Sequence, residues 1–324
     1  MSGTEFRNFL EALRINPVRC RFPLMTKQNC ASRLLCLFGF LAFAFTAAAE
    51  KKIVLIAGNP SHGPGEHEHR AGCLLLKSCL DKVPGVSSIV YSNGWPQDKG
   101  AFEGADAILI YADGGDGHPA IRPDRLLVLE ELMKKGVGLG CIHYAVEVPA
   151  NKGGPEFLRW IGGYFETFRS VNPHWDADFT VLPDHPITRG VKPFKINDEW
   201  YYHMRFPENM QGVTPILTAV PPDKTRGKPG ANDAHGGNAE VQKHMGEPEH
   251  VMWATQRPDG GRGFGITGAH YHKNWGDENF RKTVLNAVLW ISKMDVPAGG
   301  VQSSVTPEEL AANLDPKPAR KPKP

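Results

Sequence analysis

Apolar runs of strand length alternate with amphipathic helical segments through the first half of the sequence. The strand-length runs are Lys52–Ala57, Ala105–Ala112 and Val137–His143. Predominantly apolar runs of this length are typical of strands that are buried on both faces, as in parallel sheets. Between them, His69–Leu80 and Arg122–Lys135 have the 3.6-residue periodicity of helices. This order predicts an α/β fold with right-handed crossovers and a mostly parallel sheet.

The middle of the sequence, residues 148–250, is less regular and is rich in proline and glycine. Ser88–Tyr91 is a further short predicted strand in the first half. After residue 148, we predict strands at Phe179–Leu182, Thr214–Ala219, Val251–Thr255 and Gly263–Thr267, and a closing helix at Asn279–Ile291. We expect the strands at 251–255 and 263–267 to pair with each other, since only a short turn separates them.

The first 49 residues predict a secretory signal peptide. Leu34–Phe45 is an apolar run that follows Lys27 and Arg33 and precedes three alanines ending at Ala49. A positively charged start, a short apolar core and a small-residue cleavage site are the features of such a peptide. The run is shorter than the roughly 20 residues of a membrane span, so we expect export to the periplasm or medium and no permanent membrane span. Met25 is an alternative start.

The expected domain organisation is therefore a signal peptide at 1–49, one domain at 50–295 and a disordered tail at 296–324. The tail ends in a proline- and lysine-rich stretch that is too polar to pack. Three cysteines follow the signal peptide, Cys73, Cys79 and Cys141. An odd number of cysteines does not fit a disulfide framework, so the apolar core must stabilise the domain.

The charge balance excludes nucleic acid as an expected partner. Lysine and arginine number 37 against 35 acidic residues, a formal net charge of +2. Six basic and two acidic residues lie in 1–49, so residues 50–324 hold 31 basic and 33 acidic side chains and a formal charge of −2. Proteins that bind nucleic acid need a basic surface, which this composition lacks.

Histidines follow several of the predicted strands. In an open parallel sheet, ligands bind at the carboxyl ends of the strands, so we expect side chains there to share one rim. The polar residues that follow predicted strands are His62, His67, His69, Asp113, Asp116, His118, His143, His270 and His272.

This set predicts a site for a divalent transition metal, with zinc favoured. Imidazole nitrogens suit zinc, copper, iron and nickel. The candidate ligands are His62, His67, His69, His143 and His270, and Glu68, Asp198 or Glu199 could add a carboxylate. The alternative is that these are solvated or hydrogen-bonded loop histidines, because a His-x-His pair is by itself a weak signal.

The segment Asp198–His203 combines two carboxylates with three aromatic residues. Such a segment suits a sugar site, in which Trp200 and Tyr201 would take the apolar faces of the sugar and the carboxylates its hydroxyls. It equally suits a buried aromatic anchor with its acids exposed. A catalytic acid or base there would need a pKa shifted by burial or by neighbouring charges.

Three motifs together resemble the trehalose-utilisation (ThuA-like) family. They are GVGLGCIHYA at 136–145, NDEWYY at 197–202 and the segment 265–291, and the resemblance covers about residues 51–293. It implies a flavodoxin-like, three-layer α/β fold of the class I glutamine amidotransferase-like superfamily, and a role in carbohydrate metabolism. In glutamine amidotransferases a nucleophilic cysteine follows the strand at this position. Here that position is His143, and His270 has no glutamate two residues later, so glutamine hydrolysis is not expected.

The resulting hypothesis is an exported, metal-assisted enzyme acting on a sugar or glycoside derivative related to trehalose or a keto-glycoside. Its predicted catalytic residues are His143, Asp198, Glu199 and His270. Its predicted substrate contacts are Glu68, Asp113, Trp200, Tyr201, His203 and His272. The alternative is a non-catalytic carbohydrate-binding or scaffold domain on the same fold.

Overall fold

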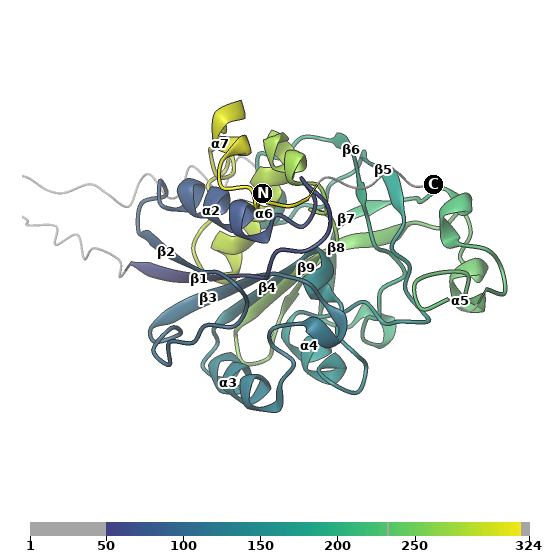
Figure 1. The fold of residues 1–324 in the computed structure, drawn as a ribbon, viewed down its shortest axis with the longest axis horizontal. Coiled ribbons are helices and arrows are strands. Elements are labelled where there is room, and N and C mark those ends of the chain that lie inside the picture. Colours follow the sequence, from purple (N-terminus) through teal and green to yellow (C-terminus); the bar gives the residue numbers. More distant parts are fainter. Residues whose placement is uncertain (1–49, 232, 319–324) are drawn as a thin grey trace, which may run out of the picture. The chain divides into compact units, whose positions relative to one another are not determined.

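The computed structural model describes residues 50–231 and 233–318. The predicted signal peptide at 1–49 lies outside these residues. Seven strands of one sheet lie in the order β2-β1-β3-β4-β9-β8-β7 (Figure 1). Their bounds are β1 Lys51–Ala57, β2 Val86–Tyr91, β3 Ala105–Tyr111, β4 Gly138–Ile142, β7 Val213–Ala219, β8 Glu249–Gln256 and β9 Arg262–Ile266.

The sheet is mixed but mostly parallel. Strands β2, β1, β3, β4 and β9 pair in parallel, whereas β8 runs antiparallel to both of its neighbours, β9 and β7. The predicted pairing of the strands near 251–255 and 263–267 is confirmed as β8 with β9. The helices are α2 His69–Leu80, α3 Pro123–Lys134, α4 Gly154–Trp160, α5 Ala239–Lys243, α6 Glu278–Ile291 and α7 Pro307–Ala311.

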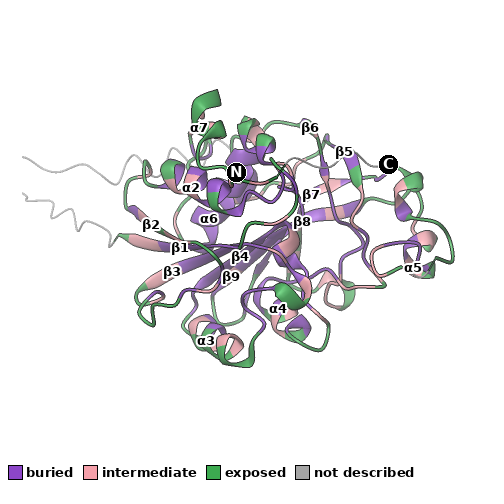
Figure 2. Cartoon of the chain, in the orientation of Figure 1, coloured by how far each residue is buried: buried purple, intermediate pink, exposed green. Residues whose placement is uncertain are grey.

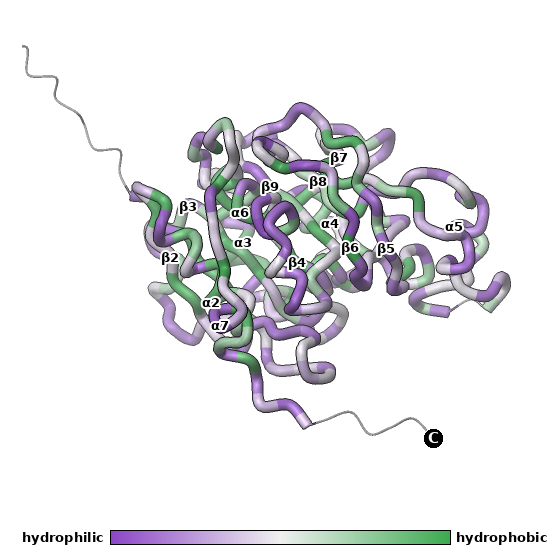
Figure 3. The backbone as a smooth tube through the Cα atoms, turned by 90° about the horizontal axis from the view of Figure 1, so that it is seen from above, coloured by the Kyte–Doolittle hydropathy of each residue, from purple (hydrophilic) through white to green (hydrophobic). Residues whose placement is uncertain are grey.

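Helices cover both faces of the sheet, which confirms the predicted α/β class. Helices α2 and α6 lie on one face, and α3 and α4 lie on the other (Figure 1). Neighbouring residues of β1 therefore enter different parts of the core: Leu55 packs with the α2 and α6 side, and Val54 with the α3 side. Burial on both faces explains why the strand is apolar almost throughout. The sheet is buried and the surrounding loops are more polar (Figures 2 and 3).

A separate two-stranded sheet corrects the prediction of a strand at 179–182. Strand β5 covers His174–Phe179 and pairs antiparallel with β6, Phe194–Glu199, which was not predicted. Alternate residues of β5 are buried and exposed, as expected for a strand with only one face in the core. Val181 is 78% exposed, so the predicted residues lie beyond the end of the strand.

The expectation of a disordered tail fails for residues 296–318. Val296 and Val301 are buried in the core, and α7 begins with a capping box in which Thr306 and Glu309 exchange hydrogen bonds. The average composition of the tail is polar, but these few apolar and capping residues suffice to fix it. Among the described residues, no helix is long and apolar enough to cross a membrane.

Candidate metal centre

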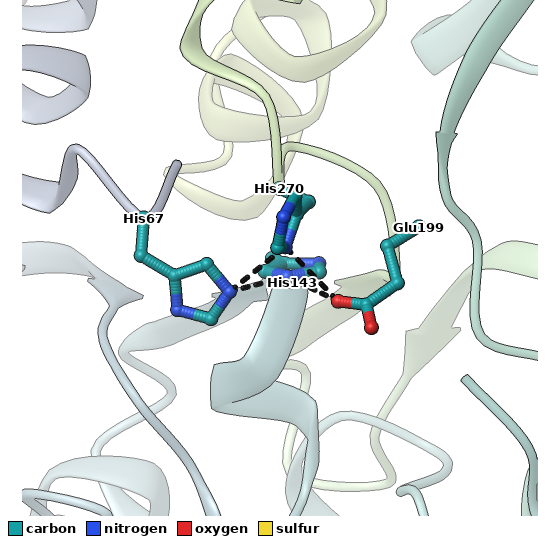
Figure 4. Close-up of side chains that lie close together, drawn as sticks. All are labelled: His67, His143, Glu199 and His270. Atoms are coloured by element: carbon teal, nitrogen blue, oxygen red, sulfur yellow. Dashed lines mark hydrogen bonds and ion pairs between the residues drawn. The ribbon is translucent and has the colours of Figure 1, made fainter. Parts of the chain in front are cut away.

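Three imidazoles and one carboxylate from four separate segments converge at the carboxyl ends of the central strands (Figure 4). His67 lies in the loop after β1, His143 directly follows β4, His270 follows β9 and Glu199 ends β6. The strand order places β4 beside β9, so two of these histidines start from neighbouring strands. The predicted convergence of histidines on one rim is therefore present: these three supply the donor atoms, and His62 and His69 lie against His67 with ring centres 3.6 and 5.4 Å away.

The donor atoms lie at the separations that a single ion requires. His67 Nε2 is 3.0 Å from His143 Nε2 and 3.1 Å from His270 Nδ1. Glu199 Oε2 is 3.0 Å from His270 Nδ1 and 3.4 Å from His143 Nε2. Ligands about 2.0–2.1 Å from a tetrahedral zinc ion are about 3.3 Å from one another. These four separations between donor atoms are thus close to the edge lengths of a tetrahedral site.

Hydrogen bonds on the far sides of two rings fix where their protons lie. His143 Nδ1 is 2.7 Å from the carbonyl oxygen of Thr267, which can only accept, so this nitrogen donates. His67 Nδ1 is 2.7 Å from the Asp113 carboxylate and likewise donates. With both protons on Nδ1, the two neutral rings direct lone pairs at each other across 3.0 Å. Such a contact is repulsive unless a cation, either a proton or a metal ion, lies between the nitrogens.

The electrostatic surroundings disfavour a proton on His67. Burial and the neighbouring imidazoles, above all His143, lower the pKa of His67 far below its ordinary value. Burial by itself would raise the pKa of Glu199, but hydrogen bonds with His143 and His270 outweigh it and hold that pKa below its usual range. Burial by itself would lower the pKa of His270, but the Glu199 charge outweighs it and raises that pKa above its ordinary value. The ionised Glu199 carboxylate and the His67 ring, which resists protonation, are donors suited to a metal ion.

The backbone carries strain at the residues of this cluster. His67 and His143 have φ values of 45° and 56°, in the left-handed region that residues with a side chain seldom adopt. His143 occupies the sharp turn between β4 and the short helical turn His143–Val146. Ala269, with a φ of 86°, comes directly before His270. Strain of this kind persists where surrounding contacts fix it and is concentrated at functional sites.

Asp198 supports this geometry from outside the cluster. Its carboxylate is fully buried and accepts hydrogen bonds from the backbone N–H groups of Ala269, at 2.7 Å, and His270, at 3.0 Å. It also accepts from the Asn274 side chain at 2.8 Å. Since both oxygens are engaged with the loop that carries His270, the geometry corresponds to a positioning residue rather than the predicted catalytic one.

The outer rim of the cluster is partly exposed. The His62 ring stacks on His67 with ring centres 3.6 Å apart, and its side chain is 39% exposed. Asp113 is 33% exposed and His174 is 47% exposed. His174 Nε2 lies 3.9 Å from Glu199 Oε1. The sequence-based prediction missed His174; the alternation of polar and apolar residues in HWDADF could have identified its strand.

Tyr201 is the one predicted aromatic contact that reaches the cluster. Its hydroxyl is 3.3 Å from His143 Nε2 and 3.4 Å from Glu199 Oε2. Burial and the Glu199 charge raise the pKa of Tyr201 well above its ordinary value, so the phenol remains protonated and can donate.

Several predicted site residues lie elsewhere. The Trp200 ring is fully buried and packs on Phe179 and Phe280, so as placed it cannot serve as a sugar platform. His272 Nε2 bonds to the carbonyl oxygen of Leu310, and His203 belongs to a different cluster. Trp200 lies between Glu199 and Tyr201, and adjacent residues of an extended segment point to opposite sides, so its ring enters the core and not the cluster.

Glu68 and His69 also lie outside the donor set. The Glu68 carboxylate pairs with Lys317 in the C-terminal segment and is buried there. His69 lies behind His67, with Nδ1 3.0 Å from the carbonyl oxygen of Asn59. Burial lowers the pKa of His69 to about 4, so its ring is neutral at pH 7.

Cys141 is a free thiol within β4 and is fully buried. Burial raises the pKa of Cys141, whereas nucleophilic cysteines need a lowered one. The thiol therefore does not supply the nucleophile of an amidotransferase.

Comparisons with known proteins agree with the fold. A family model described as ThuA, trehalose utilisation, matches residues 98–291. A ThuA-like protein from Bacteroides uniformis is similar in structure, with a TM-score of 0.55 and 15% identity over 78% of this chain and 95% of that one. A ThuA-like protein from Parabacteroides merdae has a TM-score of 0.50 and 16% identity over 80% and 94%. No curated protein matches the sequence.

Proposed function

The chain belongs to the ThuA (trehalose utilisation) family, and on that premise we propose that it is a metal-dependent enzyme acting on a sugar or glycoside derivative. The observation that carries this proposal is the pair of Nε2 atoms of His67 and His143, which face each other at 3.0 Å while both Nδ1 atoms donate elsewhere. A divalent transition-metal ion relieves that contact and accepts both lone pairs.

His67, His143 and His270 supply three nitrogens, and the Glu199 carboxylate lies at the fourth corner. These donors fit zinc, for which nitrogen and carboxylate ligands in a tetrahedron are the usual set. When bound, such an ion polarises a carbonyl group or lowers the pKa of a bound water toward neutrality. A fourth ligand that is a carboxylate can also exchange with water and act as a base beside it.

The remaining side chains of the rim suit a polyhydroxylated substrate. The Tyr201 hydroxyl lies within hydrogen-bond distance of His143 and Glu199. The partly exposed His62, Asp113 and His174 offer donors and acceptors at the outer rim. A sugar presents hydroxyls to such groups, and an oxidised keto-glycoside adds a carbonyl that an ion can polarise. The family description supports a carbohydrate, and the apolar run at 34–45 supports export.

The first experiment is elemental analysis of the purified full chain. We expect a transition metal in the parent protein and the loss of one equivalent per chain in the double variant His143→Ala/His270→Ala. His250→Ala is a matched control, because its ring lies outside the donor set and bonds to Thr218. An unchanged metal content in the folded double variant would rule out this centre.

The second experiment separates catalysis from binding. The metal-loaded protein is incubated with trehalose, simple glycosides and their keto forms, and products are followed by chromatography. Turnover that disappears in Glu199→Gln supports the enzyme. Saturable binding of a glycoside without turnover, undiminished in His143→Ala, would instead support a carbohydrate-binding domain.

A further inference from the structure

A second group of metal-type ligands lies outside the centre described above. His203 follows β6, Glu240 lies in α5 and His244 is the residue at the end of α5. One donor atom of each lies within 4.8 Å of the others. A cavity of about 190 Å³ opens beside them, with His203, His244, Arg169, Glu249 and His250 in its wall. None of these residues belongs to the first donor set.

In both rings a neighbouring carboxylate favours a proton on Nδ1. His244 Nδ1 is 2.6 Å from the Glu247 carboxylate and donates to it. His203 Nδ1 is 3.4 Å from the Glu249 carboxylate, which favours a proton on that nitrogen. Both Nε2 atoms then carry lone pairs. His203 Nε2 is buried without a hydrogen-bond partner, in a side chain that is only 7% exposed.

A buried acceptor without a partner costs free energy, on the order of 1–3 kcal/mol, unless a ligand satisfies it. His203 also has a left-handed backbone, with a φ of 57°. Orphaned polar atoms and strained backbone are both concentrated at binding sites. The lone pair of His203 therefore marks the place where a ligand of this cavity would bind.

Glu240 and His244 are spaced four residues apart, so the helical turn places them on one face. Glu240 Oε1 is 3.8 Å from His244 Nε2, while its other oxygen accepts from Lys243. These separations exceed the edges of a tetrahedral site by up to about 1.5 Å. Both side chains are partly exposed, at 42% and 36%, and can close on an ion by small rotations while buried His203 stays in place.

The net charge of the side chains around the cavity is compatible with a bound cation. The charged side chains paired around the cavity are Asp223, Glu240, Glu247 and Glu249 against Arg169, Arg226 and Lys243. Four carboxylates against three cationic groups give a net charge of −1. A bound divalent ion would change this net charge to +1, so the ion is nearly balanced by its surroundings.

We propose that His203, Glu240 and His244 bind a divalent transition-metal ion, with coordination positions open to the cavity. Two histidines and one carboxylate form a facial set that such ions accept. The ion would join α5 to the segment that follows β6, because the ligands come from these two places. This site does not depend on the function proposed for the first centre.

The test measures how many equivalents of Co²⁺ the full chain binds. The protein is first freed of metal with a chelator and then titrated with Co²⁺, and binding is monitored by the visible absorption of the bound ion. It uses the His143→Ala/His270→Ala background, in which the first centre is removed. We expect one equivalent of Co²⁺ to remain there and to be lost when Glu240→Ala/His244→Ala is added. His250→Ala is the control, because it changes the same cavity wall and removes no proposed ligand.

If the bound equivalent of Co²⁺ remains after Glu240→Ala/His244→Ala is added, the proposal is overturned. It is also overturned if the His143→Ala/His270→Ala protein binds no Co²⁺ although circular dichroism shows that it is folded. Glu240 lies in a short surface helix and His244 directly follows it, so alanine is well tolerated at both positions. The single variant Glu240→Gln is a milder second test, for which we expect at least a tenfold weaker affinity for Co²⁺. Loss of metal only through His143→Ala/His270→Ala would support the first centre and reject the second.

Discussion

Glu68 and Lys317 form an ion pair of 3.2 Å in which both side chains are almost fully buried, at 1% and 4% exposed. Lys317 Nζ also donates to the backbone carbonyl oxygens of Glu66 and His67. The N–H of Asp315 donates to Glu68 at 2.8 Å. The C-terminal segment thus holds the loop that carries His67, although the two are nearly at opposite ends of the described chain.

Removal of the Lys317 charge is expected to loosen that loop. Lys317→Met leaves the Glu68 carboxylate buried without its cation, and breaking a buried pair in this way costs about 3 kcal/mol or more of unfolding free energy. Denaturant unfolding measures the loss. Lys228→Met, at an exposed position, is the control. If Glu68→Gln is added, part of the loss should be recovered; purely additive losses would contradict the pairing.

Asp113 is expected to control metal affinity without being a ligand of the ion. It accepts from His67 Nδ1 at 2.7 Å and so keeps the lone pair of His67 on Nε2. Removal of such an outer carboxylate weakens metal binding by about 10- to 100-fold. Chelator competition should show this for Asp113→Ala. Asp116→Ala, an exposed neighbour paired with Lys152, should leave affinity unchanged; a similar weakening in both variants would count against the orienting role.

The central strands and the histidine rim could be predicted because each depends on a local pattern. Burial on both faces makes β1 and β4 visible as apolar runs, and parallel strands bring their carboxyl ends to one edge. These two facts place His67, His143 and His270 at that edge, but they place His62 and His69 there as well and do not show which of the five are ligands.

The roles of Asp198 and Glu199 could not be predicted in the same way. Successive residues of a strand point to opposite sides, so only one of two adjacent carboxylates can face the cluster. Glu199 and Tyr201 face His143, while Asp198 and Trp200 face the loop before His270. That choice depends on the pairing of β6 with β5, a tertiary contact for which the sequence carries no local signal.

Metal removal is expected to lower the thermal stability of the protein. An ion that binds only the folded state stabilises it by about 2.7 kcal/mol when its free concentration is 100 times its dissociation constant. Differential scanning calorimetry with and without a chelator should show a lower Tm after removal. The folded His143→Ala/His270→Ala variant should show a smaller shift. An equal shift in both proteins would place the stabilising ion elsewhere.

His118 is expected to make stability depend on pH in a defined window. Its ring is buried, with Nε2 donating to the Ala145 carbonyl oxygen and Nδ1 accepting from the Ala120 N–H. Burial lowers the pKa of His118 to about 4, from 6.5 when exposed. The neutral ring therefore stabilises the fold fully above pH 6.5, and this contribution is lost as the pH falls toward 4.

The size of that contribution follows from the two pKa values. A difference of about 2.5 units corresponds to about 3 kcal/mol of unfolding free energy between pH 7 and 4. His118→Gln keeps a donor and an acceptor but does not titrate. Urea unfolding in chelator should therefore show a steeper loss on acidification for the parent than for this variant, and parallel profiles would contradict the assignment.

Asp198 is expected to affect the metal centre through the backbone that it holds. In Asp198→Asn, one carboxylate oxygen becomes an NH₂ group, which cannot accept from the Ala269 N–H or from Asn274. Each buried donor that loses its acceptor costs about 1–3 kcal/mol, so we expect a loss of about 3 kcal/mol in unfolding free energy.

The same substitution should weaken metal binding because His270 follows Ala269 directly in the displaced loop. A positioning role predicts lower affinity with retained stoichiometry at saturating metal, whereas a ligand would lose the equivalent altogether. Chelator competition combined with elemental analysis distinguishes these results. Asp176→Asn, at an exposed position of β5, is the matched control. Unchanged affinity in a folded Asp198→Asn protein would show that the backbone bonds to Asp198 do not set the position of His270.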